Sequence, residues 1–229
     1  CRWIRMVAIK RLRGHSAGCL AVYSRPRRQA VAVACQRRIN ELREQTTDER
    51  DIVPRILKKT SSLLRDYLGS PLTDHGQLLS ALLTTDEASD VTGIEDGSAR
   101  LVVTSPPFLD VVNYQADNWL RCWFLGLDSS EIGISQLRNV DDWVAAMTAV
   151  MRDLRRIVAP GGHVAFEVGE VRGGKLLLEE LVLPAGVEAG LDPVIIMINA
   201  QEFTKTANTW GVDHHQKGTN TNRIVVFQR

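Results

Sequence analysis

The chain carries two patterns of apolar residues, one after the other. In its first part, apolar side chains such as Ile56, Leu57, Leu63 and Leu64 recur at helical spacing among basic residues. Loops are expected at GlyHisSerAlaGly (14–18) and SerArgPro (24–26), where the helical spacing of apolar residues breaks. The helices that this spacing predicts cover 1–13, 35–45 and Val53–Leu68.

From about Leu72 onward, short apolar runs alternate with amphipathic segments, which predicts strands and helices in turn. In chain order the predicted elements are strands over Leu78–Thr85 and Leu101–Thr104, a helix over Trp143–Val158 that ProGlyGly ends, a strand over 163–168, a helix over Leu176–Ala189, and strands over Pro193–Asn199 and Arg223–Phe227. Strands joined by crossover helices imply a mostly parallel α/β sheet. We place the boundary at GlySerProLeu, between a basic, mainly helical region (1–72) and an α/β region (73–229).

Composition fits a globular protein of one domain or one and a half. Of the 229 residues, 44% are hydrophobic and 24% charged, and no run of eighteen apolar residues exists that could cross a membrane. The four cysteines form no C-x-x-C pair and there is no signal peptide, so we expect a cytoplasmic location. The chain begins with Cys1 in a pattern typical of a helix interior, so we expect it to be a piece of a longer one.

The net charge of +1 conceals a strong asymmetry. Residues 1–66 hold sixteen Lys or Arg and six Asp or Glu, although the whole chain holds 28 and 27. A basic region joined to an acidic body is typical of proteins that bind a polyanion such as nucleic acid. Arg27 and Arg28 are candidate phosphate ligands, since the guanidinium group binds phosphate in a bidentate manner. A solvated helical face that binds nothing is the alternative.

The strand predicted over Leu101–Thr104 runs into Ser105, Pro106, Pro107 and Phe108. Each proline fixes φ and lacks an N–H, so the chain cannot continue to pair and must leave the sheet in a stiff, extended form. Ligands of open α/β sheets bind beyond the carboxyl ends of the strands, which is where this segment falls. Carbonyl groups there can accept hydrogen bonds from a ligand.

ThrSerProProPhe closely resembles the catalytic tetrapeptide of the amino-methylating DNA methyltransferases, which methylate N4 of cytosine or N6 of adenine with S-adenosylmethionine. The family pattern is Asp, Asn or Ser, then Pro-Pro and an aromatic residue, and Ser105 to Phe108 match it. Residues 161–175, 202–211 and 217–227 also resemble the later part of such enzymes, and 1–72 resembles the insert between their two halves. The resemblance implies a site-specific methyltransferase of double-stranded DNA. It also implies a partial Rossmann-like methyltransferase sheet, made of the later strands and ending in a strand pair.

The chemistry of that reaction accounts for the residue types. An exocyclic base amine is a poor nucleophile because its lone pair is delocalised into the ring. The Ser105 hydroxyl and the Pro106 carbonyl could hold its hydrogens and localise the lone pair, while Phe108 stacks on a base that has left the duplex. Ser105 in place of aspartate favours cytosine N4 over adenine N6. A non-catalytic DNA-binding remnant is the alternative, and methylation of RNA or of a protein amide is disfavoured by the matches over 202–227.

The resemblance also shows what the sequence lacks. The family binds S-adenosylmethionine through a Gly-rich turn after its first strand, and nothing in residues 1–80 matches that turn. GluValGlyGluValArgGlyGly at 167–174 is a possible substitute, but its glycines are not spaced for such a turn. We therefore expect a missing cofactor-binding half or a partner chain, and an isolated chain that is inactive or poorly folded. The residues assigned to cofactor contacts are Asp86, Thr104, Glu167 and Gly169, with a turn aspartate as the alternative for Asp86.

The remaining candidates concern DNA. Tyr114 is expected to line the base pocket from a helix, and Lys205 and Asn208 are expected to contact DNA from a polar loop, with a surface turn as the alternative. On the helix that Tyr114 begins, we expect Trp119, Trp123 and Phe124 in the core. No metal is expected, because His214 and His215 have no cysteine and no spaced carboxylate pair near them.

Overall fold

The structure, a computed structural model, describes residues 2–12, 19–20, 32–46, 49–68, 82–109, 113–133, 137–172, 174–200 and 221–229. The chain divides into two units. Unit 1 comprises Cys1–Leu82 with Tyr114–Ile134, and unit 2 comprises Leu83–Asn113 with Ser135–Arg229. The boundary predicted at 69–72 lies outside the described residues.

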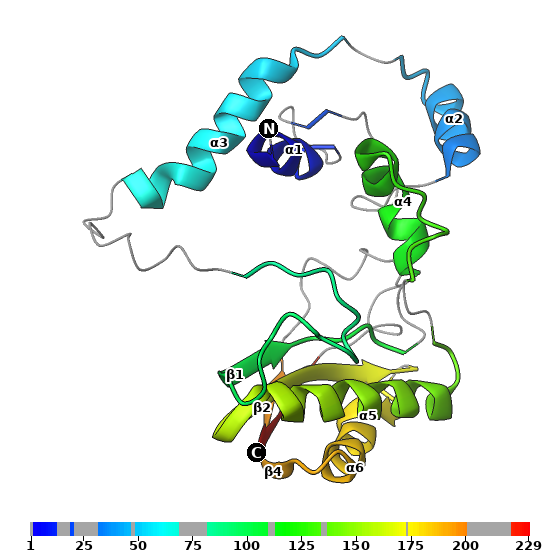
Figure 1. Cartoon of the computed structure of the whole chain (residues 1–229). Helices are drawn as coiled ribbons and strands as arrows, with labels where there is room; N and C mark the ends of the chain where they lie inside the picture. The colour runs from blue at the N-terminus through cyan, green and yellow to red at the C-terminus, as the bar shows by residue number, and fades with distance from the viewer. Residues whose placement is uncertain are drawn as a thin grey trace. The chain divides into compact units, whose positions relative to one another are not determined.

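Unit 1 is helical in its described part. Trp3 on α1 donates its indole N–H to the Thr60 hydroxyl on α3 at 3.1 Å, and Val7 and Ala8 of α1 are buried. The three predicted N-terminal helices are confirmed, although α1 ends before residue 13 and α2 begins before residue 35. The helices are α1 (Arg2–Ile9), α2 (Val33–Leu42), α3 (Ile52–Leu68) and α4 (Tyr114–Leu125) (Figure 1).

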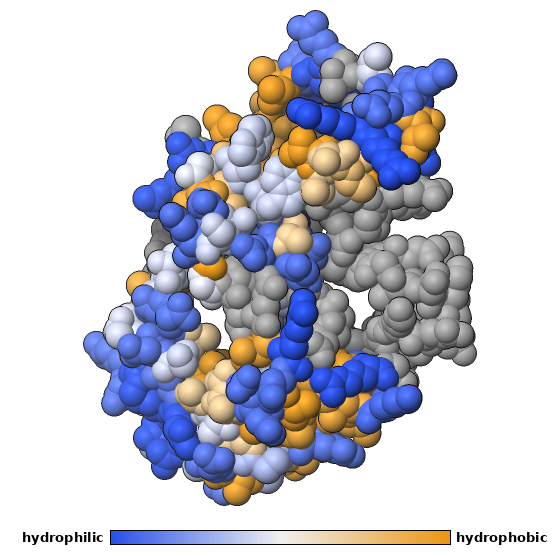
Figure 2. Space-filling view, turned by 90° about the vertical axis from the view of Figure 1, so that its right-hand side faces the viewer, coloured by the Kyte–Doolittle hydropathy of each residue, from blue (hydrophilic) through white to orange (hydrophobic). Residues whose placement is uncertain are grey.

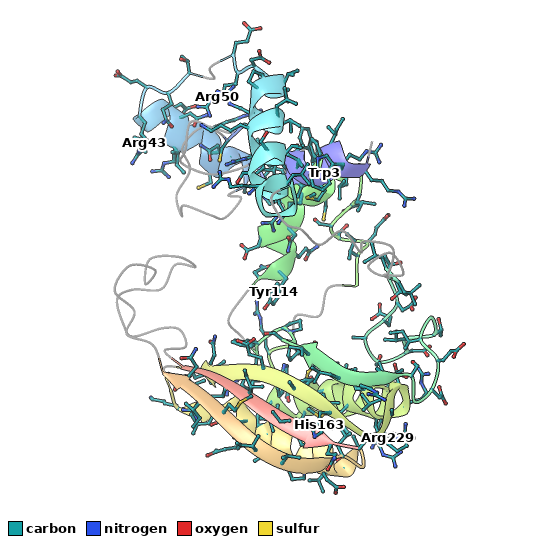
Figure 3. All side chains as sticks on the ribbon, turned by 90° about the vertical axis from the view of Figure 1, so that its left-hand side faces the viewer. Trp3, Arg43, Arg50, Tyr114, His163 and Arg229 are labelled. Atoms are coloured by element: carbon teal, nitrogen blue, oxygen red, sulfur yellow. The ribbon has the colours of Figure 1, made fainter. Side chains whose placement is uncertain are left out.

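Unit 2 is built on a sheet in the order β1-β2-β5-β4 (Figure 3). β1 and β2 are parallel, whereas β5 runs antiparallel to both β2 and β4, which are its neighbours. A short strand, β3, pairs with β2 outside this path. The strands are β1 (Ala99–Thr104), β2 (Val158–Val171), β3 (Leu176–Leu177), β4 (Asp192–Ala200) and β5 (Thr221–Gln228).

The predicted α/β class and the closing strand pair are therefore confirmed. The prediction of a mostly parallel sheet holds for β1, β2 and β4, which run in one direction, whereas the chain returns after β4 as a reversed strand, β5, between β2 and β4. The strand predicted over Leu78–Thr85 is wrong in its described part. Leu82 and Leu83 belong to no strand and are 65% and 93% exposed, so their apolar character does not place them in a sheet.

Two helices, α5 (Val140–Ile157) and α6 (Leu178–Glu188), cover one face of this sheet (Figure 1). Asn139 caps α5 by accepting the Asp141 and Asp142 amides at 2.7 and 3.3 Å. Residues at helical spacing on α5 pack against every second residue of the strands, because these side chains point toward the helix-covered face. The core between them includes Trp143, Met147, Met151, Leu154, Val164, Phe166, Val168, Val182, Val225 and Phe227.

The opposite face of the sheet carries exposed apolar side chains. Leu101 and Val103 of β1 are 61% and 72% exposed, and Ile195 and Met197 of β4 are also exposed. Figure 2 shows apolar surface among the polar surface on the part of the molecule that contains the sheet. Sheets with parallel strands are normally covered on both faces, so these side chains mark a face that the described residues leave open.

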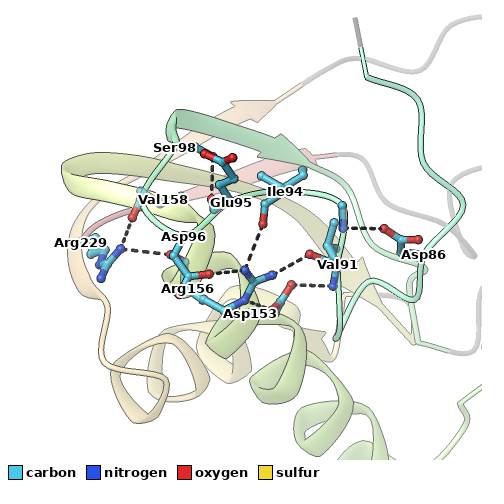
Figure 4. Close-up of polar contacts among 11 residues, drawn as sticks. Asp86, Val91, Ile94, Glu95, Asp96, Ser98, Asp153, Arg156, Val158 and Arg229 are labelled. Carbon is cyan, nitrogen blue, oxygen red and sulfur yellow. Dashed lines mark hydrogen bonds and ion pairs between the residues drawn. The ribbon is translucent and has the colours of Figure 1, made fainter.

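An arginine ties the loop before β1 to the end of α5. Arg156 donates Nε to Asp153 at 2.7 Å, Nη1 to Asp96 at 2.5 Å, and Nη2 to the Val91 carbonyl at 2.7 Å (Figure 4). The Val91 amide donates to the other oxygen of Asp153 at 2.9 Å. Burial raises the pKa of Asp153, but the bonds from Arg156 and Val91 outweigh it and hold this pKa below its ordinary value. The network fixes the approach of the chain to β1.

Asp153→Asn should lower the free energy of unfolding by about 1–3 kcal/mol at neutral pH, because it removes a charge-assisted bond from a nearly buried site. Since the folded pKa is lowered, the stabilisation is full above the ordinary carboxyl value of about 3.9 and disappears as pH falls through the folded pKa. The difference between the two proteins, measured by urea unfolding, should therefore shrink below about pH 4. Asp141→Asn on the same helix is the exposed control, and an equal loss in both variants would contradict the prediction.

Candidate functional site

The segment Ser105–Phe108 lies where the sequence places it, directly after the last residue of β1. Ser105 is exposed, Pro106, Pro107 and Phe108 are half-buried, and the next residue, Leu109, is fully buried. Phe108 packs against the core of unit 2. The tetrapeptide is thus held at one end by the sheet and at the other by the core, with the serine side chain facing solvent.

The structure adds a contact that the sequence does not predict. Trp143, in the first turn of α5 and only 2% exposed, donates its indole N–H to the Pro107 carbonyl at 3.0 Å. A buried indole N–H needs a hydrogen-bond acceptor, and the Pro107 carbonyl supplies it. The sequence does place Trp143 at an apolar position of a predicted helix. This spacing predicts that the side chain is buried, but not which acceptor its N–H contacts.

Within the part of the chain that the structure describes, no hydrogen bond involves the Ser105 hydroxyl or the Pro106 carbonyl. These are the two oxygen atoms that the sequence singles out as acceptors. The Pro107 carbonyl, in contrast, is occupied by Trp143. The two carbonyl groups of the proline pair therefore differ: the Pro107 oxygen accepts a hydrogen bond from Trp143, and the Pro106 oxygen accepts none from the described residues.

Thr104 is the last residue of β1, and Glu167 and Gly169 lie on β2 just beyond the point where β1 ends. The Thr104 side chain lies on the same face as Phe166, and the Glu167 side chain lies on the opposite face. Thr104 is paired with Phe166, the residue before Glu167, so the end of β1 lies beside this part of β2. Because side chains alternate along a strand, Glu167 points away from the helix-covered face that buries Phe166 and Val168. Figure 3 shows His163, which precedes them on the same strand. A half-buried carboxylate thus lies near the end of β1, on the open side of the sheet.

Asp86 is elsewhere in unit 2 and exposed. Its carboxylate accepts the Gly93 amide at 3.3 Å, closing the loop between them (Figure 4). This contact is that of a turn aspartate, which the sequence left as an alternative. A cofactor contact by Asp86 stays a prediction.

Tyr114 begins α4 in unit 1 and is half-buried, and its carbonyl accepts the Asn118 side-chain amide at 2.8 Å (Figure 3). On the same helix the predicted core positions Trp123 and Phe124 are wrong, since they are 68% and 36% exposed. The buried residue is Cys122, and each step along a helix turns by about 100°, which rotates the two aromatic residues off that face.

The other predicted DNA contacts, Arg27, Arg28, Lys205 and Asn208, lie outside the described residues, as do His214 and His215. Basic side chains of the described part of unit 1, including Arg37, Arg38, Lys58 and Arg65, are exposed. Among the residues that the structure describes, no three His, Cys, Asp or Glu side chains gather as a metal site requires. None of the helices described has both the length and the apolar character needed to cross a membrane.

A buried ionic cluster fixes the start of β5, the strand that follows residues 201–220. The Arg223 guanidinium, 14% exposed, pairs with Glu179 in the first turn of α6 and with Glu170 of β2 at 3.5 Å. Glu179 is 6% exposed in its side chain, so the pair lies almost entirely out of water. The cluster joins β2, β5 and α6 at the end of the sheet where Thr104 and Glu167 lie.

No protein-family model and no curated protein matches the chain. Solved structures similar to it include a candidate DNA modification methylase of Thermus thermophilus complexed with S-adenosyl-L-methionine, at 19% identity, with 62% of this chain and 51% of that chain covered and a TM-score of 0.39. A SAM-dependent methyltransferase of Methanosarcina mazei has 8% identity, 64% and 66% coverage and a TM-score of 0.37. The 4+2 cyclase SpnF has 10% identity, 100% and 94% coverage and a TM-score of 0.41.

The chain spans about half the length of the Thermus protein.

Arg223→Met should lower the free energy of unfolding by about 3–5 kcal/mol, because it leaves two nearly buried carboxylates without their cation. Adding Glu179→Leu to this variant should restore part of the loss, since one uncompensated charge is then removed. Chemical unfolding of the single and double variants measures both effects. Arg152→Met is the control, because its pair with Glu188 is exposed on both sides and should contribute less than about 1 kcal/mol. Equal losses in the two arginine variants would contradict the prediction.

Proposed function

We propose that this chain carries the base pocket of an S-adenosylmethionine-dependent DNA methyltransferase that modifies an exocyclic amine, with cytosine N4 favoured over adenine N6. The observation that carries the proposal is the position of Ser105–Phe108. The segment directly follows β1, is anchored by Leu109 and Trp143, and presents the Ser105 side chain to solvent. Both the tetrapeptide and its place at a strand end support an amine-methylating site.

The residues of the segment have distinct roles in this proposal. The Ser105 hydroxyl oxygen and the Pro106 carbonyl oxygen each accept a hydrogen bond from the amine. These bonds localise the lone pair of the nitrogen and direct it toward the incoming methyl group. Phe108 stacks on the base through the exposed part of its ring. Extrusion of a base from the duplex costs a few kcal/mol, and stacking on an aromatic side chain returns about 1–3 kcal/mol, so the two nearly balance.

S-adenosylmethionine would supply an electrophilic methyl group to this nitrogen. Thr104, Glu167 and Gly169 are proposed to contact this cofactor, because all three lie where β1 ends beside β2. Glu167 offers a carboxylate acceptor on the open face, and Gly169, which is buried, adds no side chain beside it. These residues fit the rim of a cofactor pocket and not a whole one.

The open side of the sheet supports a further part of the proposal. Among the described strands β1 has a single neighbour, β2, and its side chains Leu101 and Val103 are exposed. We propose that the cofactor-binding strands pair with this edge and that their helices cover this face. They belong either to another part of the same protein or to a partner chain.

DNA is the proposed substrate because of the charge of unit 1 and the chemistry of the pocket. The basic region holds Arg27 and Arg28 as proposed phosphate ligands, and exposed basic side chains on α2 and α3 extend this character. Tyr114, Lys205 and Asn208 are proposed to contact the target base or its flanking nucleotides. Trp123, which the sequence predicts to be in the core, is exposed and adds an aromatic surface to unit 1.

Ser105→Ala should abolish methyl transfer to duplex DNA, or reduce it by about a hundredfold, because the amine loses an acceptor next to the reacting nitrogen. The assay uses tritiated S-adenosylmethionine with mixed-sequence duplex DNA, and calorimetry measures cofactor binding by the same proteins. Cofactor affinity should not change with the substitution. Ser98→Ala at the other end of β1 is the matched control, since the Ser98 hydroxyl donates to the Glu95 carbonyl in its turn.

Transfer that continues unchanged in Ser105→Ala would contradict the proposed site. The wild-type chain alone is expected to bind no cofactor, so the strands proposed to complete the sheet must be supplied before transfer is assayed. Absence of transfer by the completed protein would support the alternative of a DNA-binding remnant. Cofactor binding with full transfer by the chain alone would instead contradict the proposed need for additional strands.

Replacing Arg27 and Arg28 by Gln should weaken DNA binding and flatten its dependence on salt. Each phosphate contact contributes about 0.9 to the slope of log K against log salt concentration, so the slope should fall by nearly 2. Fluorescence anisotropy of a labelled duplex over a salt series gives this slope. Arg152→Gln, an exposed arginine of α5, is the control. An unchanged slope would remove these two residues from the interface.

A further inference from the structure

The proline pair leaves the candidate site with unusually little torsional freedom. The rings of Pro106 and Pro107 fix both of their φ angles, and a following proline restricts ψ of both Ser105 and Pro106. Between the Cα atom of Ser105 and the nitrogen of Phe108, one soft torsion therefore remains, which is ψ of Pro107. That torsion sets the direction of the Pro107 carbonyl.

Trp143 holds this carbonyl. Its indole N–H donates to the Pro107 oxygen at 3.0 Å, and the ring is 2% exposed within the core. The donor cannot move easily, because α5 is capped by Asn139 and packs on β2 through Met147 and Met151. Neither proline has an N–H of its own, so the segment can be held only by donors from elsewhere, and α5 supplies one.

The consequence concerns the geometry between Ser105 and Phe108. If ψ of Pro107 rotates, Phe108 turns relative to the Ser105 hydroxyl and the Pro106 carbonyl. With that torsion fixed, an aromatic surface and two acceptors keep one arrangement before any ligand arrives. Such preorganisation lowers the cost of binding a planar group that carries an amine.

We propose that Trp143 is a positioning residue of the Ser105–Phe108 site, acting through the Pro107 carbonyl to fix the one soft torsion of the segment. The structural part of this inference stands on the hydrogen bond alone. Its catalytic part rests on the proposed function, because it requires that an amine be methylated there.

Trp143→Phe tests the inference, since it removes the N–H and keeps an aromatic ring in the core. Nitrogen-15 relaxation of the full chain should show a lower order parameter at the Phe108 amide, because this N–H lies in the same peptide plane as the Pro107 carbonyl. The order parameters within β2, at Val164 to Val168, should be unchanged. Trp123→Phe, on an exposed tryptophan, is the control and should alter neither region.

A loss of order confined to Phe108 supports positioning. Unchanged order there, or an equal loss across α5 and β2 as a packing defect would give, overturns it. If Trp143→Phe does not fold, indole exchange of the wild-type chain labelled with nitrogen-15 tryptophan decides instead. One indole N–H should then exchange far more slowly than the others, and the absence of a protected indole overturns the inference.

A kinetic readout separates this inference from the proposed function. Where methyl transfer is measurable, Trp143→Phe should lower kcat about tenfold with an unchanged KM for S-adenosylmethionine. An equal effect on both constants would overturn the catalytic part. If no transfer occurs in any condition, the proposed function fails while the relaxation experiment still decides the role of Trp143.

Discussion

The burial of one face of β2 beneath α5 and α6 is the constraint on which the rest of unit 2 depends. Val164, Phe166 and Val168 of β2 are fully buried, and burying such side chains contributes about 1.5–3 kcal/mol each. This packing fixes the register of β1 beside β2, and with it the position where β1 ends. It also orients α5 so that Trp143 reaches the Pro107 carbonyl. The candidate site is therefore a product of the core, although its chemistry is at the surface.

Around that core, electrostatic contacts hold the segments that approach and leave the sheet. Arg156 fixes the loop before β1 through Asp153 and Asp96, and Arg223 fixes the start of β5 through Glu179. These arginines bond to groups from distant parts of the sequence, so each links two elements. The polar groups that the proposed chemistry uses, on Ser105, Pro106 and Glu167, are outside both clusters. Structural charges and candidate site groups are thus separate.

Much of this could be predicted from the sequence, and the failures have identifiable causes. The end of β1 at the proline pair follows from residues that cannot pair, and α5 follows from its apolar spacing. The reversed position of β5 could not be predicted, because strand order depends on contacts between distant segments. Leu82 and Leu83 look like a strand but lack a neighbour to pair with among the described residues, and Trp123 looks like core but lies a helical step away from Cys122. The hydrogen bond of Trp143 depends on a register between α5 and the end of β1 that periodicity does not encode.

The central claim is that Ser105 and Pro106 accept the hydrogens of an exocyclic amine on an unpaired base. The most direct test compares the affinity of the chain for two duplexes that differ at one unpaired position, with cytosine in one and uracil in the other. Cytosine should bind about tenfold more tightly, because uracil presents an oxygen to the two acceptors and leaves them unsatisfied. Ser105→Ala should reduce that preference. Equal affinity for the two duplexes would contradict the amine pocket.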